Sequence, residues 1–282
     1  MHKATALAAA LLTLMACDPV EDRLELTNSF RPDEVKLEAV QTAGGNGNGI
    51  TLKMTTPGVT GYWDYKIGKK YTDRVEFVFP YTGEVTFTYH ITSYYIDGAL
   101  KDVRHEDITK DITLTVGQMD QAIADPYYAL VGDNLEGKTW VLDTERAAGW
   151  WFMSAPNKLE GCMEAWWDAG NQSASEGWAP ADYLGKMTFD LAGGANFTHY
   201  ASRDGAPSKV GSFGFNADFT KLIINGDQKI LCNTSDRGNP NGEYLIYKLT
   251  KDEMVLYNPV TSGGDSGWTW VFKPLRSSNA PV

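Results

Sequence analysis

Side chains that bind transition metals are scarce in this sequence of 282 residues. It contains four histidines and three cysteines, and no two cysteines have the C-x-x-C spacing. A structural zinc ion takes four such ligands in closely spaced pairs, so we expect no conventional zinc site. The regular carboxylate spacing of a calcium loop is also missing. We therefore expect no cofactor and leave metal binding unassigned.

Positive charge is also in short supply, with 25 Lys and Arg against 36 Asp and Glu, a net charge of −11. A nucleic-acid-binding protein needs a basic stripe to displace counterions, so we expect no nucleic-acid partner. The sequence has no P-loop, dinucleotide fingerprint or nucleophile elbow either. What it does have is 43% hydrophobic and 12% aromatic residues, which is typical of a folded globular chain.

Long hydrophobic runs are absent except at the N-terminus. Lys3 is followed by twelve apolar or small residues, from Ala4 to Met15. That run is shorter than the roughly 20 residues that span a bilayer, so residues 1–16 are predicted to be a signal peptide. The tetrapeptide Leu14-Met15-Ala16-Cys17 resembles the bacterial lipoprotein signal. The resemblance implies that Cys17 is lipidated and becomes the new N-terminus; an ordinary secreted protein is the alternative.

Three acidic residues, Asp18, Glu21 and Asp22, follow this cysteine. They resemble the export tag that sends Bacteroidetes lipoproteins to the outer face of the outer membrane, which implies a lipid-anchored protein facing the cell exterior. A solvated tether is the plainer interpretation of the same charges. Residues 18–48 are polar and lack periodicity, so we interpret them as a tether and a first turn, with the flexible tether covering residues 17–37.

Period-two alternation predicts antiparallel strands at residues 50–54, 74–79, 84–91 and 111–116. These strands would form a small sandwich over residues 38–116. The run from Phe79 to Phe87 resembles the Tyr-x-x-x-Gly-x-Tyr-x-Val run of the polycystic-kidney-disease-type (PKD) immunoglobulin-like module. Residues 62–65 stand where that family has its Gly-Asp-Gly turn. The resemblance implies a spacer that holds another domain away from the membrane.

Residues 117–133 are predicted to link two domains through a short helix that ends at Pro126. Strand patterns resume at residues 139–143, 183–191, 197–201, 209–215, 221–224, 243–249, 253–257 and 268–273. They predict an all-β chain in which residues 134–282 form a larger antiparallel sandwich or barrel.

Residues 138–143, 183–190 and 249–256 resemble the lipocalin-like or jelly-roll C-terminal domain of Bacteroidetes surface lipoproteins that accompany polysaccharide-degrading enzymes. The resemblance implies non-catalytic capture of a polysaccharide or oligosaccharide for uptake. It also implies a partner in an outer-membrane transporter complex.

Eight of the nine tryptophans lie in the second domain. Trp140, Trp268 and Trp270 fall inside strand patterns, so we expect them mainly in the core. The others lie between residues 144 and 182, where strand periodicity is weak. An exposed indole can stack on a sugar ring while nearby polar side chains bond to its hydroxyls. The expected glycan-binding residues are Trp150, Trp151, Trp166, Trp167, Trp178, Glu164, Asp168 and Asn171. The alternative is that one indole of each doublet points inward.

Catalysis by the same segment is less favoured. Glu160, Glu164 and Asp168 lie four residues apart, and glycoside hydrolysis requires two carboxylates. That spacing also fits a solvated helical turn, and no strand-borne hydrolase signature is found. A glycoside hydrolase therefore remains one alternative. A structural or adhesive protein with every Trp in the core is the second, and a barrel that holds apolar ligands in an empty interior is the third.

Two cysteines remain after Cys17, at positions 162 and 232. In an oxidising compartment Cys162 and Cys232 can form a disulfide, and two buried free thiols are the alternative. The sequence does not decide between them.

Overall fold

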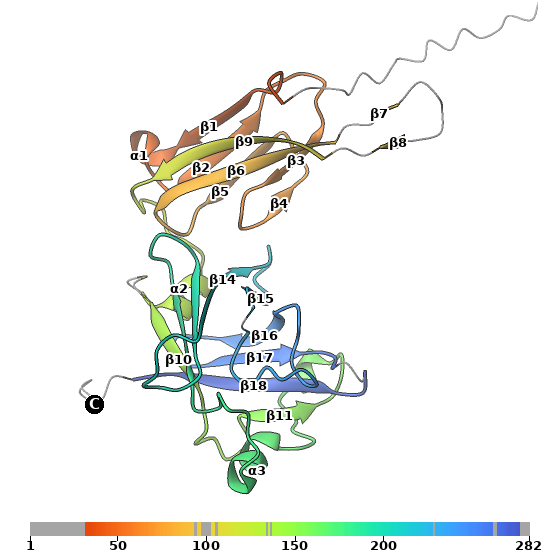
Figure 1. Cartoon of the computed structure of the whole chain (residues 1–282). Coiled ribbons are helices and arrows are strands. Elements are labelled where there is room, and N and C mark those ends of the chain that lie inside the picture. Colours follow the sequence, from red (N-terminus) through yellow and green to blue (C-terminus); the bar gives the residue numbers. More distant parts are fainter. Residues whose placement is uncertain are drawn as a thin grey trace, which may run out of the picture.

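The computed structural model describes residues 32–92, 95–96, 103–104, 107–133, 135, 137–227, 229–261 and 264–276. The predicted signal peptide, Cys17 and the predicted tether as far as residue 31 lie outside these residues. The described chain consists mainly of strands and folds into two β domains, which confirms the all-β prediction (Figure 1).

Two antiparallel sheets make up the first domain. The smaller contains β1 (Leu37–Gln41), β2 (Gly49–Met54) and β5 (Arg74–Val78). The larger contains β4 (Lys69–Lys70), β3 (Gly61–Asp64), β6 (Gly83–Thr92) and β9 (Asp107–Val116), in that order. The short strands β7 (Tyr95–Ile96) and β8 (Val103–Arg104) pair with each other. All four strands predicted in this region are therefore found.

Aromatic residues from the larger sheet dominate the core between the two sheets. Trp63 on β3 is fully buried and contacts Tyr89 on β6 edge to face, with ring centroids 5.1 Å apart. The turn that the PKD resemblance suggested for residues 62–65 comes slightly later. Residues up to Asp64 belong to β3, and the chain reverses at Tyr65–Gly68, where Lys66 has a left-handed φ of 71°.

The polar residues before β2 are ordered, which differs from the expectation of a tether and loose turn up to residue 48. Residues 42–45 form a short helical turn, α1 (Thr42–Gly45). The side chain of Asn48 is buried and donates to the carbonyls of Phe79 and Gln121 at 3.1 and 3.0 Å. It also accepts from the Gln121 amide at 2.8 Å. One buried amide side chain can satisfy several backbone groups, and composition does not reveal this.

Within the described residues, the second domain is one antiparallel sheet whose strands follow each other in chain order and close into a barrel. The barrel strands are β10 (Lys138–Leu142), β12 (Lys186–Asp190), β13 (Asn196–Tyr200), β14 (Lys209–Phe215), β15 (Lys221–Asn225), β16 (Glu243–Leu249), β17 (Met254–Asn258) and β18 (Gly267–Pro274). Pairing of β10 with β18, through Trp140 and Pro274 among others, closes the ring. The order is that of an up-and-down barrel rather than a jelly roll.

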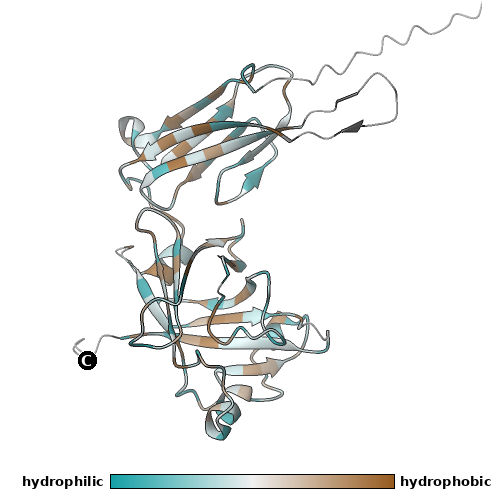
Figure 2. Cartoon of the chain, in the orientation of Figure 1, coloured by the Kyte–Doolittle hydropathy of each residue, from teal (hydrophilic) through white to brown (hydrophobic). Residues whose placement is uncertain are grey.

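Side chains fill the barrel interior. Inward positions alternate with outward ones along β12 to β15. Figure 2 shows hydrophobic and hydrophilic bands on the strands of both domains. The buried interior includes Phe189, Phe197, Leu222, Tyr244 and Trp270, all in one packed cluster. An eight-stranded barrel can hold either its own side chains or one small ligand. The packed cluster is the first arrangement, whereas the apolar-ligand alternative requires an empty interior.

The helix expected in the linker is α2 (Asp125–Val131), but Pro126 begins it instead of ending it. Proline suits the first helical turn, where its missing N–H has no partner to lose. Tyr127 packs edge to face on Phe215 at 5.1 Å, and Trp140 donates its indole N–H to the Leu130 carbonyl at 2.9 Å. Tyr127, Leu130 and Val131 therefore belong to the barrel core, and α2 lies at the end of the barrel nearer the first domain (Figure 1).

Candidate functional site

A strand that the sequence did not reveal, β11 (Trp151–Ser154), pairs with the first half of β18. It lies at the end of the barrel opposite α2 (Figure 1). Trp150 and Trp151 are only 1% and 0% exposed there. This corrects their expected role as surface platforms for sugar, because neither indole offers a face to solvent. Both belong to the hydrophobic core.

Asp168 and Asn171, expected to bond to sugar hydroxyls, are instead occupied within the protein. Asp168 is the N-cap of α3 (Ala169–Glu176) and accepts from the Asn171 amide at 3.0 Å. The Asn171 side chain donates to Asp168 at 2.7 Å and accepts from the Trp150 indole at 3.0 Å. The two residues therefore start the helix and fix Trp150. Glu164 is exposed and bonds to no other described side chain.

The second doublet, Trp166-Trp167, lies along the free side of β11. Met153 donates to the Trp167 carbonyl at 3.0 Å and accepts from the Trp166 amide at 2.8 Å. Neighbouring residues on an extended segment point to opposite sides. Trp166 accordingly is 55% exposed, whereas Trp167 is partly buried against the barrel core.

Helix α3 fixes the Trp167 and Trp178 rings through their indole nitrogens. Gln172 accepts from the Trp167 indole, and Glu176 accepts from the Trp178 indole at 2.8 Å. Gln172 also donates to Glu176 at 3.0 Å. Gly177, with a left-handed φ of 78°, ends the helix and turns the chain towards Trp178. The two rings stack with centroids 5.8 Å apart and planes 27° apart, and Trp178 is 38% exposed.

Hydrogen bonds from Trp178 and Gln172 lower the pKa of Glu176 below its ordinary value. These donors favour the charged form of the carboxylate. Glu176 is therefore ionised at neutral pH, with one oxygen bonded to each neighbour. Its position is set by the two bonds that also hold the indole.

An arginine from the loop between β15 and β16 lies among four indoles. The Arg237 guanidinium carbon is 5.1 to 5.9 Å from the ring centroids of Trp268, Trp151, Trp167 and Trp178. Within about 6 Å, the face of an indole attracts a cation electrostatically. The side chain is 25% exposed. We call these five residues the Trp-Arg cluster.

Two asparagines, of which Asn258 is buried, hold the loop that carries Arg237. The Asn258 side chain donates to the carbonyls of Arg237 and Gly238 at 3.3 and 3.0 Å. Asn233 accepts from the Asn239 amide at 2.8 Å and from the Tyr244 hydroxyl at 2.6 Å. The guanidinium is thus placed by a fixed backbone and not by a free surface loop. Sequence reasoning missed Arg237 because it stands in a polar loop, distant in sequence from every tryptophan it contacts.

The two cysteines of this domain, Cys162 and Cys232, are free and buried in the structure, the arrangement of the two-thiol alternative. Burial raises the pKa of Cys162 to about 11 and raises that of Cys232 well above its ordinary value. A thiol needs a lowered pKa to act as a nucleophile. These side chains therefore pack and do not react.

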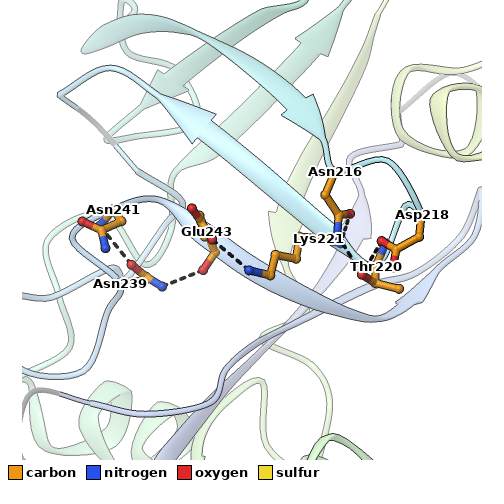
Figure 3. Close-up of polar contacts among 7 residues, drawn as sticks. All are labelled: Asn216, Asp218, Thr220, Lys221, Asn239, Asn241 and Glu243. Atoms are coloured by element: carbon orange, nitrogen blue, oxygen red, sulfur yellow. Dashed lines mark hydrogen bonds and ion pairs between the residues drawn. The ribbon is translucent and has the colours of Figure 1, made fainter. Parts of the chain in front are cut away.

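The side chains of a polar network at two turns of the barrel also bond within the protein (Figure 3). Asp218 accepts from the Thr220 hydroxyl at 2.7 Å, and Lys221 pairs with Glu243 at 3.0 Å. Asn239 donates to the Glu243 carbonyl at 2.7 Å. Its members bond to one another and fix the turns around β15. Across the described part of the chain, no group of three or more His, Cys, Asp or Glu side chains is arranged to hold a metal ion.

The chain matches none of the known protein families and none of the curated proteins with which it was compared. Of the helices in the described ranges, none is both long enough and apolar enough to cross a membrane.

Proposed function

We propose that this chain is a non-catalytic glycan-binding lipoprotein of the cell surface, and that it binds sugar through the solvent-facing part of the Trp-Arg cluster. The observation that carries the proposal is the stacked pair Trp167 and Trp178, which is partly exposed and held in place by α3. Of the eight residues that the sequence predicted to bind glycan, Trp167 and Trp178 remain in the proposed site. Arg237 is added to them.

A flat, immobilised indole suits a sugar ring for a physical reason. The apolar face of a pyranose gains contact area on the ring, and little side-chain entropy is lost because the ring is already fixed. Polar groups at the rim can then bond to hydroxyls. Glu176 and Gln172 lie at this rim, since each bonds to an indole nitrogen of the pair.

The remaining parts of the proposal come from the sequence resemblances. Cys17 carries the lipid anchor to the outer membrane, and the chain faces the cell exterior. The first domain is a PKD-like spacer, and the barrel is lipocalin-like, which its up-and-down strand order supports. The captured polysaccharide or oligosaccharide passes to a partner transporter complex.

The test is affinity electrophoresis of residues 18–282, which include every described residue, in gels that contain plant, fungal or host polysaccharides. We expect retardation in at least one gel and its loss in Trp178→Ala. Trp166→Ala is the matched control, because Trp166 is also exposed but points away from the cluster. No retardation in any gel would refute the proposal. Loss in Trp166→Ala alone would move the site to the other face.

The hydrolase alternative makes a different prediction in the same material. It requires turnover of a bound glycan that stops when Glu164 or Asp168 is neutralised, with binding retained. The structure gives this alternative little support, because Asp168 already bonds to Asn171 through both carboxylate oxygens. The structural alternative predicts that no glycan binds and that each tryptophan variant only lowers stability.

A further inference from the structure

Most hydrogen-bond donors of Arg237 have no acceptor among the described residues. Its ion pair with a described residue joins Nε to Asp236 at 3.4 Å. The two terminal nitrogens donate to no described residue, although a guanidinium has five N–H groups. The four indoles hold the cation in place but offer it no oxygen acceptor. The guanidinium is thus positioned, partly exposed and short of acceptors.

A second unsatisfied donor belongs to the same cluster. The indole N–H of Trp151 is buried and has no acceptor among the described residues. Buried polar groups normally have a partner in the protein, in water or in a ligand. The ring of this indole is 5.4 Å from the Arg237 guanidinium carbon. The cluster therefore contains two kinds of unused donor and lacks acceptors to match.

The carboxylates nearest to the cluster compete weakly for Arg237. Asp236 is 60% exposed and contacts it only at Nε, so its charge is largely screened by solvent. The two carboxylate oxygens of Glu176 already accept hydrogen bonds from Trp178 and Gln172. A carboxylate from outside the protein would be free to accept from both terminal nitrogens at once, the geometry in which arginine binds carboxylates best.

We infer that Arg237 makes this site selective for glycans that carry a carboxylate, namely those with uronic acid residues. The inference rests on the proposed glycan-binding function and specifies its ligand. The sugar ring lies on the Trp167–Trp178 pair, whose centroids are 5.4 and 5.9 Å from the guanidinium carbon. The carboxylate on that ring, or on its neighbour, then reaches the terminal nitrogens of Arg237.

The net charge of the chain restricts the ligand further. At −11 the protein repels a dense polyanion over long range. One arginine held in a local aromatic site can still bind a single carboxylate, because that contact is short and partly desolvated. The fitting ligand is therefore a mainly neutral glycan with isolated uronic acid branches rather than a polyuronate.

The experiment compares one polymer with and without its carboxylates. Titration calorimetry measures binding of residues 18–282 to glucuronoxylan and to the same polymer after chemical reduction of its carboxyls to alcohols. We expect the native polymer to bind about ten- to a hundredfold more tightly, the value of a charge-assisted hydrogen-bonded pair. Arg237→Gln should abolish this preference. Arg203→Gln, which removes an exposed arginine outside the cluster, should leave it intact.

Each other outcome has a defined meaning. Equal binding of the two polymers, or a preference that persists in Arg237→Gln, overturns the inference and leaves the proposed function standing. Binding of neither polymer, together with binding of another glycan in the gels, does the same. Binding of no glycan at all overturns both. If Arg237→Gln fails to melt cooperatively, Arg237→Lys replaces it. An undiminished preference of Arg237→Lys for the native polymer would exclude carboxylate binding by the paired terminal nitrogens of Arg237.

Discussion

Replacing Arg237 by glutamine should destabilise the barrel, even without any ligand. The change removes a cation that lies 5.1 to 5.9 Å from the centroids of four indoles and leaves a shorter, neutral polar side chain. A cation–π contact contributes about 0.5–1 kcal/mol at an exposed site and about 2 kcal/mol when desolvated. One cation does not interact at full strength with four rings at once. We therefore expect the free energy of unfolding to fall by about 2 kcal/mol in total. The exposed pair with Asp236 adds about 0–1 kcal/mol.

Urea unfolding followed by tryptophan fluorescence is the appropriate assay, because eight of the nine tryptophans lie in the second domain and report on it. Arg237→Lys keeps the charge but removes the planar group, so it should lower the free energy of unfolding by less than Arg237→Gln does. The control is Arg203→Gln, an exposed change expected to alter the unfolding free energy by less than about 0.5 kcal/mol. An equally small effect of Arg237→Gln would refute the reasoning, since it would mean that the ring contacts contribute nothing.

Three further predictions concern the same end of the barrel. Trp150→Ala should lower the unfolding free energy by about 3–5 kcal/mol, because it empties a buried site and leaves the side-chain carbonyl of Asn171 without its donor. Trp166→Ala should lower it by less than about 0.5 kcal/mol. Similar decreases for the two variants in urea unfolding would contradict the assigned burial. Glu176 has a lowered pKa, so its stabilising bonds are present above about pH 4.3 and are lost as the pH falls through the lower folded value. The acid change in Trp fluorescence should therefore shrink in Glu176→Gln, and an unchanged acid transition would count against the bond to Trp178. Cys162 and Cys232 should resist a thiol reagent in the native protein and should both react after unfolding, whereas the finding of no free thiol in urea would reveal a disulfide.

The barrel strands could be read from the sequence because their signal is local. Each inward residue is followed by an outward one, and this alternation located all eight barrel strands to within three residues at each end. The pattern fails for β11, where Trp151, Phe152 and Ser154 are all buried. Phe152 packs on the outside of the barrel against Val255 and Val271. Burial on both faces removes the alternation, so the segment resembled a loop.

Other features depend on contacts that no local pattern contains. Proline is compatible both with the end of a helix and with its first turn, and only the packing of Tyr127 into the barrel places Pro126 at the start of α2. The sequence could likewise show that five tryptophans share one segment. Which of them reach solvent follows from the pairing of β11 with β18, and this pairing is long-range.

The position of the site follows from the way the barrel closes. Strand β18 is longer than β10, so β10 pairs with its last residues and β11 with its first. This leaves the other side of β11 as an unpaired edge, which folded proteins generally cover. Trp166 and Trp167 cover it through two hydrogen bonds to Met153. The strand pairing that protects the edge also brings Trp167 within 6.0 Å of Trp268 on β18, and hence next to Arg237. The cluster is thus built at the seam of the barrel, where a partly covered edge leaves room for both an exposed indole and a held guanidinium.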